Sequence, residues 1–346
     1  MSSSLPSLAI IGCGAIVEKW HLRALKKLSW TPTILVDRDE ERLKGLQKRS
    51  KCPVTSTDFH ALIGNVDAAI VAVPHGMHAD ICVPLLESGI DLLVEKPLAL
   101  SVSECRRISE AARANERIVA VGHMRRFLSG HRWVKALLDA DGLGRIVSAD
   151  FREGGPFSWP VASPAVWSRD SYGGGVLMDT GAHTLDLLLW WLGDLSIDYY
   201  RDDNLGGVEA DCEGRGSMRD GGIVRFELSR TRSLRGTAKI LGEKGAIEVD
   251  LVAGTVSAEP PGLLERRFGA AEGPASKGEG FMTMYTSQLA EFLECIRARK
   301  EPTCSAADAT GVVDLIQQCY RVRQPLELPW FRPTPSGPVE VEEVAE

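Results

Sequence analysis

The sequence predicts an α/β protein that begins with a doubly wound parallel sheet and continues into a sheet of a different kind. In the first third of the chain, short continuous apolar runs such as residues 68–73 and 90–94 alternate with longer amphipathic segments. Continuous apolar strands are typical of parallel sheets that helices cover on both faces. From about residue 208 to residue 256 apolar and polar residues alternate, which indicates antiparallel strands with one covered face.

The elements of the first third follow from these runs and from the residues that bound them. Strands are expected at residues 8–11, 33–36, 68–73, 90–94 and 118–121, all of which contain β-branched residues. Helices are expected at residues 16–28, 39–51, 78–88 and 101–115. Gly89 suits the end of the third helix, and Ser101 with Glu104 suits the start of the fourth.

The rest of the chain reads as a second domain. We expect a bridging helix at residues 130–140, a strand at 145–152, an irregular segment at 153–175, a helix at 179–192 and closing helices at 285–299 and 306–323. The expected domains are residues 1–123 and 124–331. The Pro-rich and then acidic tail, residues 332–346, has a composition that predicts disorder.

Composition excludes several classes of function. The chain has 346 residues, 44% of them hydrophobic and 25% charged, as in soluble globular proteins. A net charge of −7 argues against nucleic acid as a partner. No apolar run approaches the ~20 residues that cross a membrane, and the chain starts without a basic or cleavable apolar segment, so we expect a cytoplasmic protein. None of the eight cysteines forms a C-x-x-C pair, which argues against a zinc ribbon.

A glycine loop follows the first expected strand. Gly12 allows a tight turn and Gly14 lets the backbone approach a pyrophosphate, while Ala15 and Ile16 open a helix whose N–H groups favour an anion. The third position of the dinucleotide fingerprint is Val17 rather than Gly or Ala. We therefore expect a dinucleotide site here, although a purely structural turn would use the same residues.

Asp37 ends the second strand and predicts which dinucleotide binds. Its carboxylate suits the 2′-hydroxyl of the adenosine ribose, which favours NAD. The adjacent Arg38 leaves NADP open, since a guanidinium can hold a 2′-phosphate.

Two further loops lie at the same edge of the expected sheet. Glu95-Lys96-Pro97 ends a buried strand, so the Lys96 ammonium should point toward the crevice where doubly wound sheets bind ligands. The loop after residues 68–73 should border the nicotinamide half of the cofactor, although His78 could simply cap a helix. The expected cofactor contacts of these two loops are Val73, Pro74, His75, His78, Glu95 and Lys96.

A glycine run leads into the helix that begins near Asp179. Asp179 and His183 are four residues apart and should share one face, with Asp186 near the same stripe. Asp179 could orient the His183 imidazole and favour its charged form, or serve as a helix N-cap, and His183 could be a core histidine. Three ligands from one helix suit a metal ion poorly, so no metal is expected.

Together these motifs resemble the Gfo/Idh/MocA oxidoreductase family, from about residue 8 to residue 329. They include Gly12-x-Gly14, Glu95-Lys96-Pro97, residues 124–127 and Asp179-x-Gly181-x-His183-x-x-Asp186. The resemblance implies a Rossmann domain, then a C-terminal α/β domain on a largely antiparallel open sheet. It also implies NAD- or NADP-dependent oxidation or reduction of a carbinol or carbonyl on a sugar or cyclitol.

The resemblance also assigns residues to roles. The catalytic lysine, aspartate and histidine of inositol dehydrogenases match Lys96, Asp179 and His183. Arg125 and Glu153 fall where the family contacts substrate or cofactor. Trp167 and Arg169, in the irregular segment, are added as expected substrate contacts, although the tryptophan could be core packing.

The expected function is therefore NAD-dependent hydride transfer to or from a sugar, nucleotide sugar or cyclitol. His183 would act as the base or acid, and Lys96 would stabilise the developing alkoxide. Two alternatives stay open: a redox-neutral enzyme that keeps its NAD, and a non-catalytic NAD-binding regulator. An open sheet face predicts a homodimer or homotetramer. The arginines from Arg225 to Arg235 are expected on a solvated or interfacial face.

Overall fold

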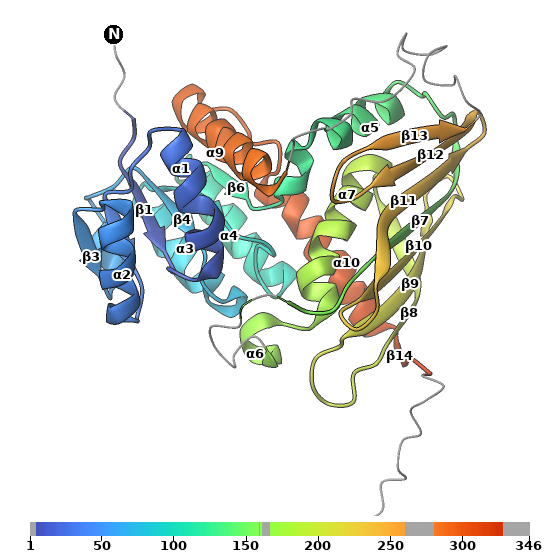
Figure 1. Ribbon diagram of the computed structural model, residues 1–346, viewed down its shortest axis with the longest axis horizontal. Helices are drawn as coiled ribbons and strands as arrows, with labels where there is room; N and C mark the ends of the chain where they lie inside the picture. The colour runs from blue at the N-terminus through green and yellow to red at the C-terminus, as the bar shows by residue number, and fades with distance from the viewer. Residues whose placement is uncertain (1–4, 159, 161–166, 260–279, 328–346) are drawn as a thin grey trace, which may run out of the picture.

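Two sheets side by side organise the molecule (Figure 1). The computed structural model describes residues 5–158, 160, 167–259 and 280–327. The expected tail, residues 332–346, lies outside the described residues. The first sheet is parallel and the second is mostly antiparallel, which confirms the predicted α/β class.

The first sheet has six parallel strands in the order β3-β2-β1-β4-β5-β6. Its strands are β1 (Leu8–Ile11), β2 (Ile34–Val36), β3 (Val54–Ser56), β4 (Ala68–Val71), β5 (Asp91–Val94) and β6 (Val119–Val121). Its helices are the π-helical η1 (Val17–His21), α1 (Leu22–Lys27), α2 (Glu40–Ser50), η2 (Phe59–Leu62), η3 (His75–Met77), α3 (His78–Glu87) and α4 (Val102–Ala114). The sequence reading missed β3 because residues 54–56 are partly exposed and form only a three-residue edge strand.

Burial on both faces explains the apolar strands. Along β1, Ala9 and Ile11 pack into one hydrophobic cluster, whereas Leu8 and Ile10 pack into another on the opposite face. The four side chains are at most 3% exposed. Each face therefore has its own core, as a parallel sheet covered by helices requires.

The second sheet has eight strands in the order β13-β12-β11-β7-β10-β9-β8-β14. Its strands are β7 (Ile146–Gly154), β8 (Leu195–Asp202), β9 (Asp211–Met218), β10 (Ile223–Ser229), β11 (Leu234–Gly242), β12 (Gly245–Asp250), β13 (Val256–Glu259) and β14 (Arg323–Pro325). Only the pairs β7–β10 and β8–β14 are parallel. The strand expected at residues 145–152 is β7, and the run of strands expected from about residue 208 begins earlier, with β8 at Leu195.

The helices after β6 are η4 (Met124–Phe127), α5 (Ser129–Asp139), α6 (Arg169–Tyr172), the π-helical η6 (Leu177–Gly181), α7 (Ala182–Leu192), α9 (Phe281–Ala298) and α10 (Ala306–Arg321). Of these, α5, η6, α7 and α10 contribute side chains to the hydrophobic core on one face of the second sheet. In Figure 1, α7 and α10 lie between the second sheet and the first, and the far side of the second sheet carries no described helix. The second sheet thus has one covered and one open face.

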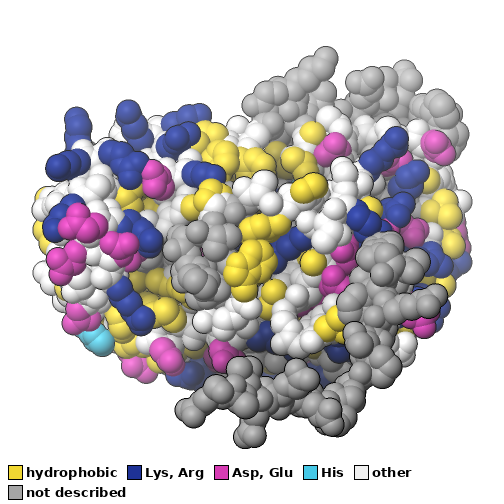
Figure 2. All heavy atoms as spheres, turned by 60° about the horizontal axis from the view of Figure 1, so that its bottom comes forward, with side chains coloured by type: hydrophobic (Ala, Val, Ile, Leu, Met, Phe, Trp, Pro, Cys, Tyr) yellow, Lys and Arg dark blue, Asp and Glu magenta, His cyan; other side chains and the backbone are white. Residues whose placement is uncertain are grey.

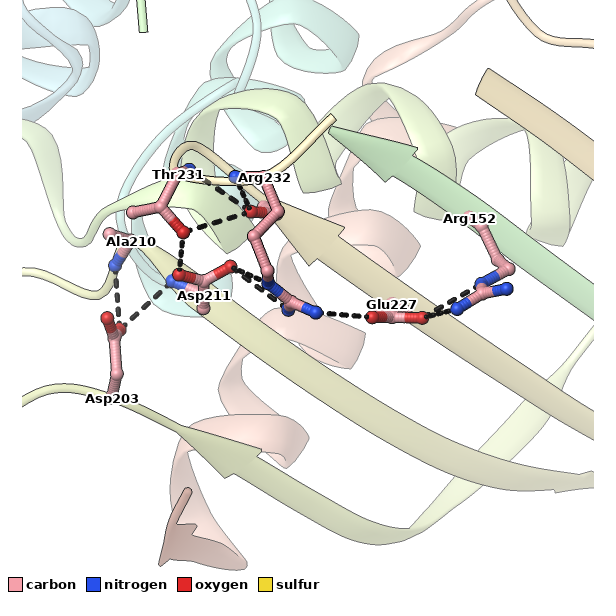
Figure 3. A network of polar contacts seen from close by, with 8 residues as sticks. Arg152, Asp203, Ala210, Asp211, Glu227, Thr231 and Arg232 are labelled. Carbon is pink, nitrogen blue, oxygen red and sulfur yellow. Dashed lines mark hydrogen bonds and ion pairs between the residues drawn. The ribbon is translucent and has the colours of Figure 1, made fainter. Parts of the chain in front are cut away.

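The open face carries charged side chains in a network (Figure 3). Arg232 donates to Asp211 and to Glu227, each at 3.1 Å, and Arg152 donates to Glu227 at 2.8 Å. These residues fit the solvated or interfacial face that the sequence predicts for the arginines from Arg225 to Arg235, with one exception described below. Figure 2 shows a different face of the molecule, the one at the bottom of Figure 1, where acidic and basic side chains are interspersed around hydrophobic side chains near the centre.

The closing helices return to the first sheet. Met284, Leu289 and Phe292 of α9 join the hydrophobic cluster that contains Leu8 and Ile10. Helix α10 contributes to the cores of both sheets. The division at residue 123 therefore stays a proposal about the chain, since its C-terminal part completes the first core.

Of the helices in the described ranges, none combines the length and the apolar character that a bilayer span needs.

Candidate functional site

A cavity of about 830 Å³ opens at the carboxyl ends of the strands in the first sheet and extends to the second domain. Gly12 and Gly14 line one part of it, and Lys96, Asp179 and His183 line another. Doubly wound sheets bind ligands at this edge because loops and helix starts meet there. The volume and the position of the cavity thus suit a dinucleotide together with a second small molecule.

The glycine loop is built as the sequence predicts. Gly12 has φ +85°, and a Cβ there would lie 2.3 Å from the Ala72 carbonyl oxygen of the neighbouring strand end. A Cβ on Gly14 would meet no described atom within 4 Å, so this backbone borders open space. Ala15 and Ile16 also line the cavity, where the chain enters η1. The loop therefore leaves free space beside the Gly14 backbone.

The two glycines are expected to respond differently to alanine. Gly12→Ala should destabilise the fold by about 1–3 kcal/mol, because it combines a strained φ with a backbone clash. Gly14→Ala should leave stability unchanged and weaken NAD binding, because the methyl group occupies the space of the pyrophosphate. Urea unfolding and calorimetric titration with NAD measure the two effects. Equal NAD affinity in Gly14→Ala and the unaltered protein would contradict the placement of the phosphates.

Asp37 lies at the end of β2 and lines the cavity beside Arg38 and Arg42. Its Oδ2 accepts a hydrogen bond from the Cys13 backbone N–H at 2.6 Å, and its Oδ1 accepts from the Asp39 N–H at 3.0 Å. The Arg42 guanidinium lies 3.5 Å from Oδ2. The carboxylate is thus held in place, with an arginine nearby that sequence reasoning did not identify.

Lys96 follows β5 and reaches across to the second domain. Its Nζ donates to Asp179 Oδ1 at 2.7 Å and to the Asp179 carbonyl oxygen at 3.1 Å. Arg230 donates to the other carboxylate oxygen, Oδ2, at 2.7 Å. Burial alone would raise the pKa of the Asp179 carboxyl, but the Lys96 and Arg230 charges outweigh it and hold the pKa well below its ordinary value. Asp179 is therefore a carboxylate shared by two cations.

His183 lines the same cavity, so the structure brings it together with Lys96. Burial lowers the pKa of this histidine well below 6.5, and the charges of Lys96 and Arg125 lower it further. The imidazole is therefore neutral at neutral pH and can accept a proton.

One expectation about this pair is wrong. Asp179 was expected to orient the His183 imidazole and favour its charged form. Both oxygens of Asp179 are instead engaged by Lys96 and Arg230, and His183 Nδ1 has no hydrogen-bond partner among the described residues. The reason is local: Asp179 lies in the π-helical turn η6, where the four-residue spacing of an α-helix does not apply.

Asp186 does not join the cavity. Its carboxylate is completely buried and accepts from Arg126 Nε at 3.0 Å and from Arg126 Nη2 at 2.7 Å. The pair ties α7 to η4, because Arg126 lies in η4 and also donates to the Thr303 carbonyl oxygen. Asp186 is thus a structural anchor rather than part of the Asp179 stripe.

Arg125 and Glu153 line the cavity as a buried pair. Two parallel hydrogen bonds of 2.7 and 2.5 Å join their side chains, and Thr184 donates to Glu153 at 2.9 Å. The pairing holds the Arg125 guanidinium in place and neutralises the charge of Glu153, whose side chain is 11% exposed. Both residues line the cavity, and their contact with a substrate stays a prediction.

Glu95 also reaches the cavity, next to an aromatic group. His21 Nε2 lies 2.7 Å from Glu95 Oε1. Burial would raise the pKa of Glu95, but the contact with His21 outweighs it and lowers the pKa. Trp20 stacks on Phe281 and Tyr285, and the three rings line the cavity.

Three expected contacts lie elsewhere. His78 is completely buried outside the cavity lining, with Nδ1 3.1 Å from the Pro97 carbonyl oxygen and Nε2 3.0 Å from that of Val73. Trp167 is 47% exposed and packs edge-on against Phe157, and Arg169 stacks over the Tyr320 ring. Neither lines the cavity. Val73, Pro74 and His75 do line it, as expected.

The sequence reading missed two sets of cavity residues. Arg230 was assigned to a solvated face, but it is 9% exposed and bonded to Asp179. Arg230 comes just after β10, where the alternation of apolar and polar residues has ended, so the sequence pattern does not indicate that its side chain is buried. The aromatic group combines Trp20 with Phe281 and Tyr285, which lie at least 261 positions later, and no local pattern reveals such a contact.

Comparison with known families matches most of the chain. The model of the oxidoreductase family with an NAD-binding Rossmann fold, GFO/IDH/MocA, matches residues 7–123. The model of the GFO/IDH/MocA C-terminal domain matches residues 131–248.

Individual relatives are similar over nearly the whole chain. The 1,5-anhydro-D-fructose reductase of Ensifer adhaerens is 23% identical over 88% of this chain and 93% of that protein. The inositol 2-dehydrogenase of Pseudomonas fluorescens is 27% identical over 93% of this chain and 97% of its own.

Solved structures share the fold. The WlbA dehydrogenase from Bordetella pertussis, in complex with NADH and UDP-GlcNAcA, has a TM-score of 0.82 at 19% identity, over 93% of this chain and 96% of that one. The aldose-aldose oxidoreductase from Caulobacter crescentus has a TM-score of 0.80 at 21% identity, over 92% and 97% of the two chains.

Proposed function

Because this chain belongs to the GFO/IDH/MocA family of oxidoreductases with an NAD-binding Rossmann fold, we propose that it is an NAD-dependent dehydrogenase or reductase. Its substrate would be a sugar, nucleotide sugar or cyclitol with a hydroxyl or carbonyl at the reacting carbon. The names of its relatives support this class, since they include an anhydrofructose reductase and inositol dehydrogenases. The observation that carries the proposal is the single cavity lined by the glycine loop, Lys96 and His183.

The cofactor would be held by the glycine loop and by Asp37. Gly14 borders open space where a pyrophosphate fits, and Asp37 presents a fixed carboxylate for a ribose hydroxyl. Bound NAD supplies the hydride acceptor, or donor in the reverse direction.

His183 would exchange the proton. As a neutral imidazole it can take the proton of the substrate hydroxyl during oxidation and return it to the oxygen during reduction. Arg125 and Glu153, paired beside it, would hold neighbouring hydroxyl groups of the substrate.

Lys96 would stabilise negative charge on the reacting oxygen. An ammonium held in position stabilises a developing alkoxide more than one that must reorganise. Asp179 and Arg230 provide that fixed position, since the carboxylate binds both cations at 2.7 Å. Asp179 would thus act through Lys96 rather than through His183.

Removing the Lys96 ammonium should test this role. Lys96→Met keeps much of the side-chain volume, and we expect kcat to fall by about 10²–10³, as when an oxyanion-stabilising donor is lost. NAD affinity should change by less than about fivefold, a shift below roughly 1 kcal/mol. Stopped-flow turnover and NAD titration measure both. Lys44→Ala, at an exposed pair with Glu41, is the control. Near-normal kcat in Lys96→Met would contradict the assignment.

Cofactor choice gives a second test. We expect NAD to bind at least about tenfold more tightly than NADP, about 1.4 kcal/mol, because a 2′-phosphate would face the Asp37 carboxylate. Asp37→Asn keeps an acceptor for the Cys13 N–H but removes the negative charge. The difference between the affinities for NAD and NADP should therefore become smaller. Arg38 and Arg42 would then be available to the phosphate. Asp39→Asn, at the N-cap of α2, is the control. Tighter NADP binding by the unaltered protein would contradict the role of Asp37.

The reaction itself is tested with a panel of sugars, nucleotide sugars and cyclitols. Purified protein is mixed with each compound and NAD or NADP, and nicotinamide absorbance and product are followed. Absorbance change with one substrate class supports the proposal. Product without a net absorbance change would indicate a redox-neutral enzyme, and tight NAD binding without any product would indicate a regulator.

Two further expectations remain predictions. The protein is expected in the cytoplasm, and its open sheet face is expected to form a homodimer or homotetramer. Light scattering coupled to size-exclusion chromatography measures the mass in solution, and a monomer at micromolar concentration would contradict the second expectation.

A further inference from the structure

The charged side chains around the reacting groups balance one another. In the part of the cavity that holds Lys96 and His183, here called the reaction part, the described lining residues comprise three cations and three carboxylates. They are Lys96, Arg125 and Arg230, and Glu95, Glu153 and Asp179. The protein groups of the reaction part therefore carry no net formal charge.

The donors of these cations are largely used within the protein. Arginine binds phosphate and carboxylate groups with the same planar fork of N–H donors. Glu153 occupies the fork of Arg125 at 2.7 and 2.5 Å, and Arg230 donates to Asp179 at 2.7 Å. Lys96 makes two hydrogen bonds to Asp179, which leaves one of its three N–H groups for the reacting oxygen.

This pairing bears on the charge of the substrate. A phosphate or carboxylate on the substrate would have to displace Glu153 or Asp179 from its arginine. The displaced carboxylate would then stay in a buried site without its partner, which is unfavourable. The reaction part thus suits a substrate without charge.

An aromatic group forms another wall of the cavity. Trp20 stacks on Phe281 and Tyr285, with ring centres 5.2 and 5.9 Å apart. Phe281 is 38% exposed and Trp20 is half-buried, so part of their ring surface stays accessible. The group adjoins the reaction part, because Tyr285 packs edge-on against His21, whose Nε2 contacts Glu95.

The two walls match the two kinds of surface on a sugar or cyclitol ring. Hydroxyl groups stand at the rim of such a ring, and C–H groups form apolar patches on its faces. Apolar patches pack well against aromatic rings, whereas hydroxyl groups need hydrogen-bond partners. The paired charges supply such partners, and the aromatic group supplies the apolar contact.

We propose that the substrate is an uncharged sugar or cyclitol without a phosphate or nucleotide group, and that a C–H face of its ring packs against Trp20 and Phe281. This inference rests on the proposed function and narrows its substrate class. A nucleotide sugar is the alternative, since a nucleobase also stacks on aromatic rings. Its diphosphate, however, would bring negative charge to arginines that already bind carboxylates.

Binding to the protein loaded with NADH tests the inference without any turnover. The probes are glucose, galactose and N-acetylglucosamine, each compared with its own uronate and its own UDP derivative, together with myo-inositol. Ligand-observed NMR titration gives Kd, and we expect the best uncharged probe to bind at least about tenfold more tightly than any charged one. Saturation transfer should be strongest at ring C–H protons. Tighter binding of a uronate or a UDP-sugar, or no binding of any uncharged probe, would overturn the inference.

Glu153→Gln should change the preference for charge. It leaves the charge of Arg125 unpaired, while the amide oxygen can still accept from Thr184. We expect uronates to bind this variant at least about tenfold more tightly than they bind the unaltered protein, because a free guanidinium binds a carboxylate. Glu227→Gln, which removes an equal charge outside the cavity lining, is the control. Unchanged uronate affinity in Glu153→Gln that is folded by circular dichroism would contradict the charge argument.

Trp20→Ala tests the aromatic wall, and Trp20→Phe keeps a ring there. The Kd of the best uncharged probe should rise about 3- to 10-fold in Trp20→Ala and less in Trp20→Phe, as when an aromatic contact is lost. Leu205→Ala, at a 68% exposed side chain outside the cavity lining, should leave Kd unchanged. Weaker NADH binding in Trp20→Ala with an unchanged Kd of the probe would assign the rings to the cofactor and refute the proposed stacking.

The inference and the proposed function fail separately. An uncharged probe that binds but gives no product with NAD or NADP leaves the inference intact and refutes the dehydrogenase function. Turnover of a UDP-sugar or a uronate in preference to its uncharged counterpart refutes the inference and leaves hydride transfer intact.

Discussion

Replacing His183 with alanine is expected to lower kcat by about 10²–10⁴, the usual contribution of a positioned general acid or base. NAD affinity should be retained, because His183 belongs to α7 and not to the glycine loop or to the loop that holds Asp37. Steady-state kinetics and NAD titration measure the two quantities. A matched control is His131→Gln: this histidine is also buried, but it packs against Trp191 outside the cavity lining. Near-normal turnover in His183→Ala would contradict the assignment of His183 as the base.

The pH dependence follows from the same residue. Burial and the neighbouring cations hold the pKa of His183 well below 6.5. As pH falls through 6.5, an ordinary histidine would gain a proton and lose its function as a base, whereas His183 stays deprotonated. We therefore expect kcat/KM for oxidation to stay level through pH 6.5 and to decline only at lower pH. Half-loss of kcat/KM near pH 6.5 would show an unperturbed base.

Breaking the pair between Arg126 and Asp186 is expected to have the largest effect on stability. Both side chains are at most 2% exposed, so Asp186→Ala leaves a buried guanidinium without its partner. Loss of one member of a buried pair typically costs about 3–5 kcal/mol. The double variant Arg126→Met with Asp186→Leu should recover part of the loss, because it removes both charges. Urea unfolding followed by circular dichroism measures the differences.

An exposed pair provides the comparison. Arg152 and Glu227 on the open face of the second sheet (Figure 3) form a similar contact, but the Arg152 side chain is 59% exposed. Arg152→Ala should therefore cost at most about 1 kcal/mol. If Asp186→Ala lowers the free energy of unfolding by no more than Arg152→Ala does, the buried pair does not anchor α7 to η4.

Local patterns were enough to predict most of the fold. Each expected strand of the first sheet is present, because its continuous apolar residues can only be buried on both faces. Ser101 caps α4 and accepts from the Glu104 N–H, as the capping pattern predicts. The edge strand β3 was missed because it is short and partly exposed, so it has no apolar signal.

The candidate site was predicted less completely. The sequence by itself determined which chemical groups stand at strand ends and helix starts: Gly12, Gly14, Asp37, Lys96 and His183 all line the cavity. Spacing along the chain specifies these positions because strand ends in a parallel sheet share one edge.

Only the tertiary structure decided the partners of those groups. Asp179, in the π-helical turn η6, binds Lys96 and Arg230, not His183. Lys96 follows β5 of the first sheet and Arg230 follows β10 of the second, so the packing of the two sheets brings the three residues together. Trp20 meets Phe281 and Tyr285 only because η1 packs against α9. Contacts between residues distant in the chain depend on the packing of whole elements, and no local period records that packing.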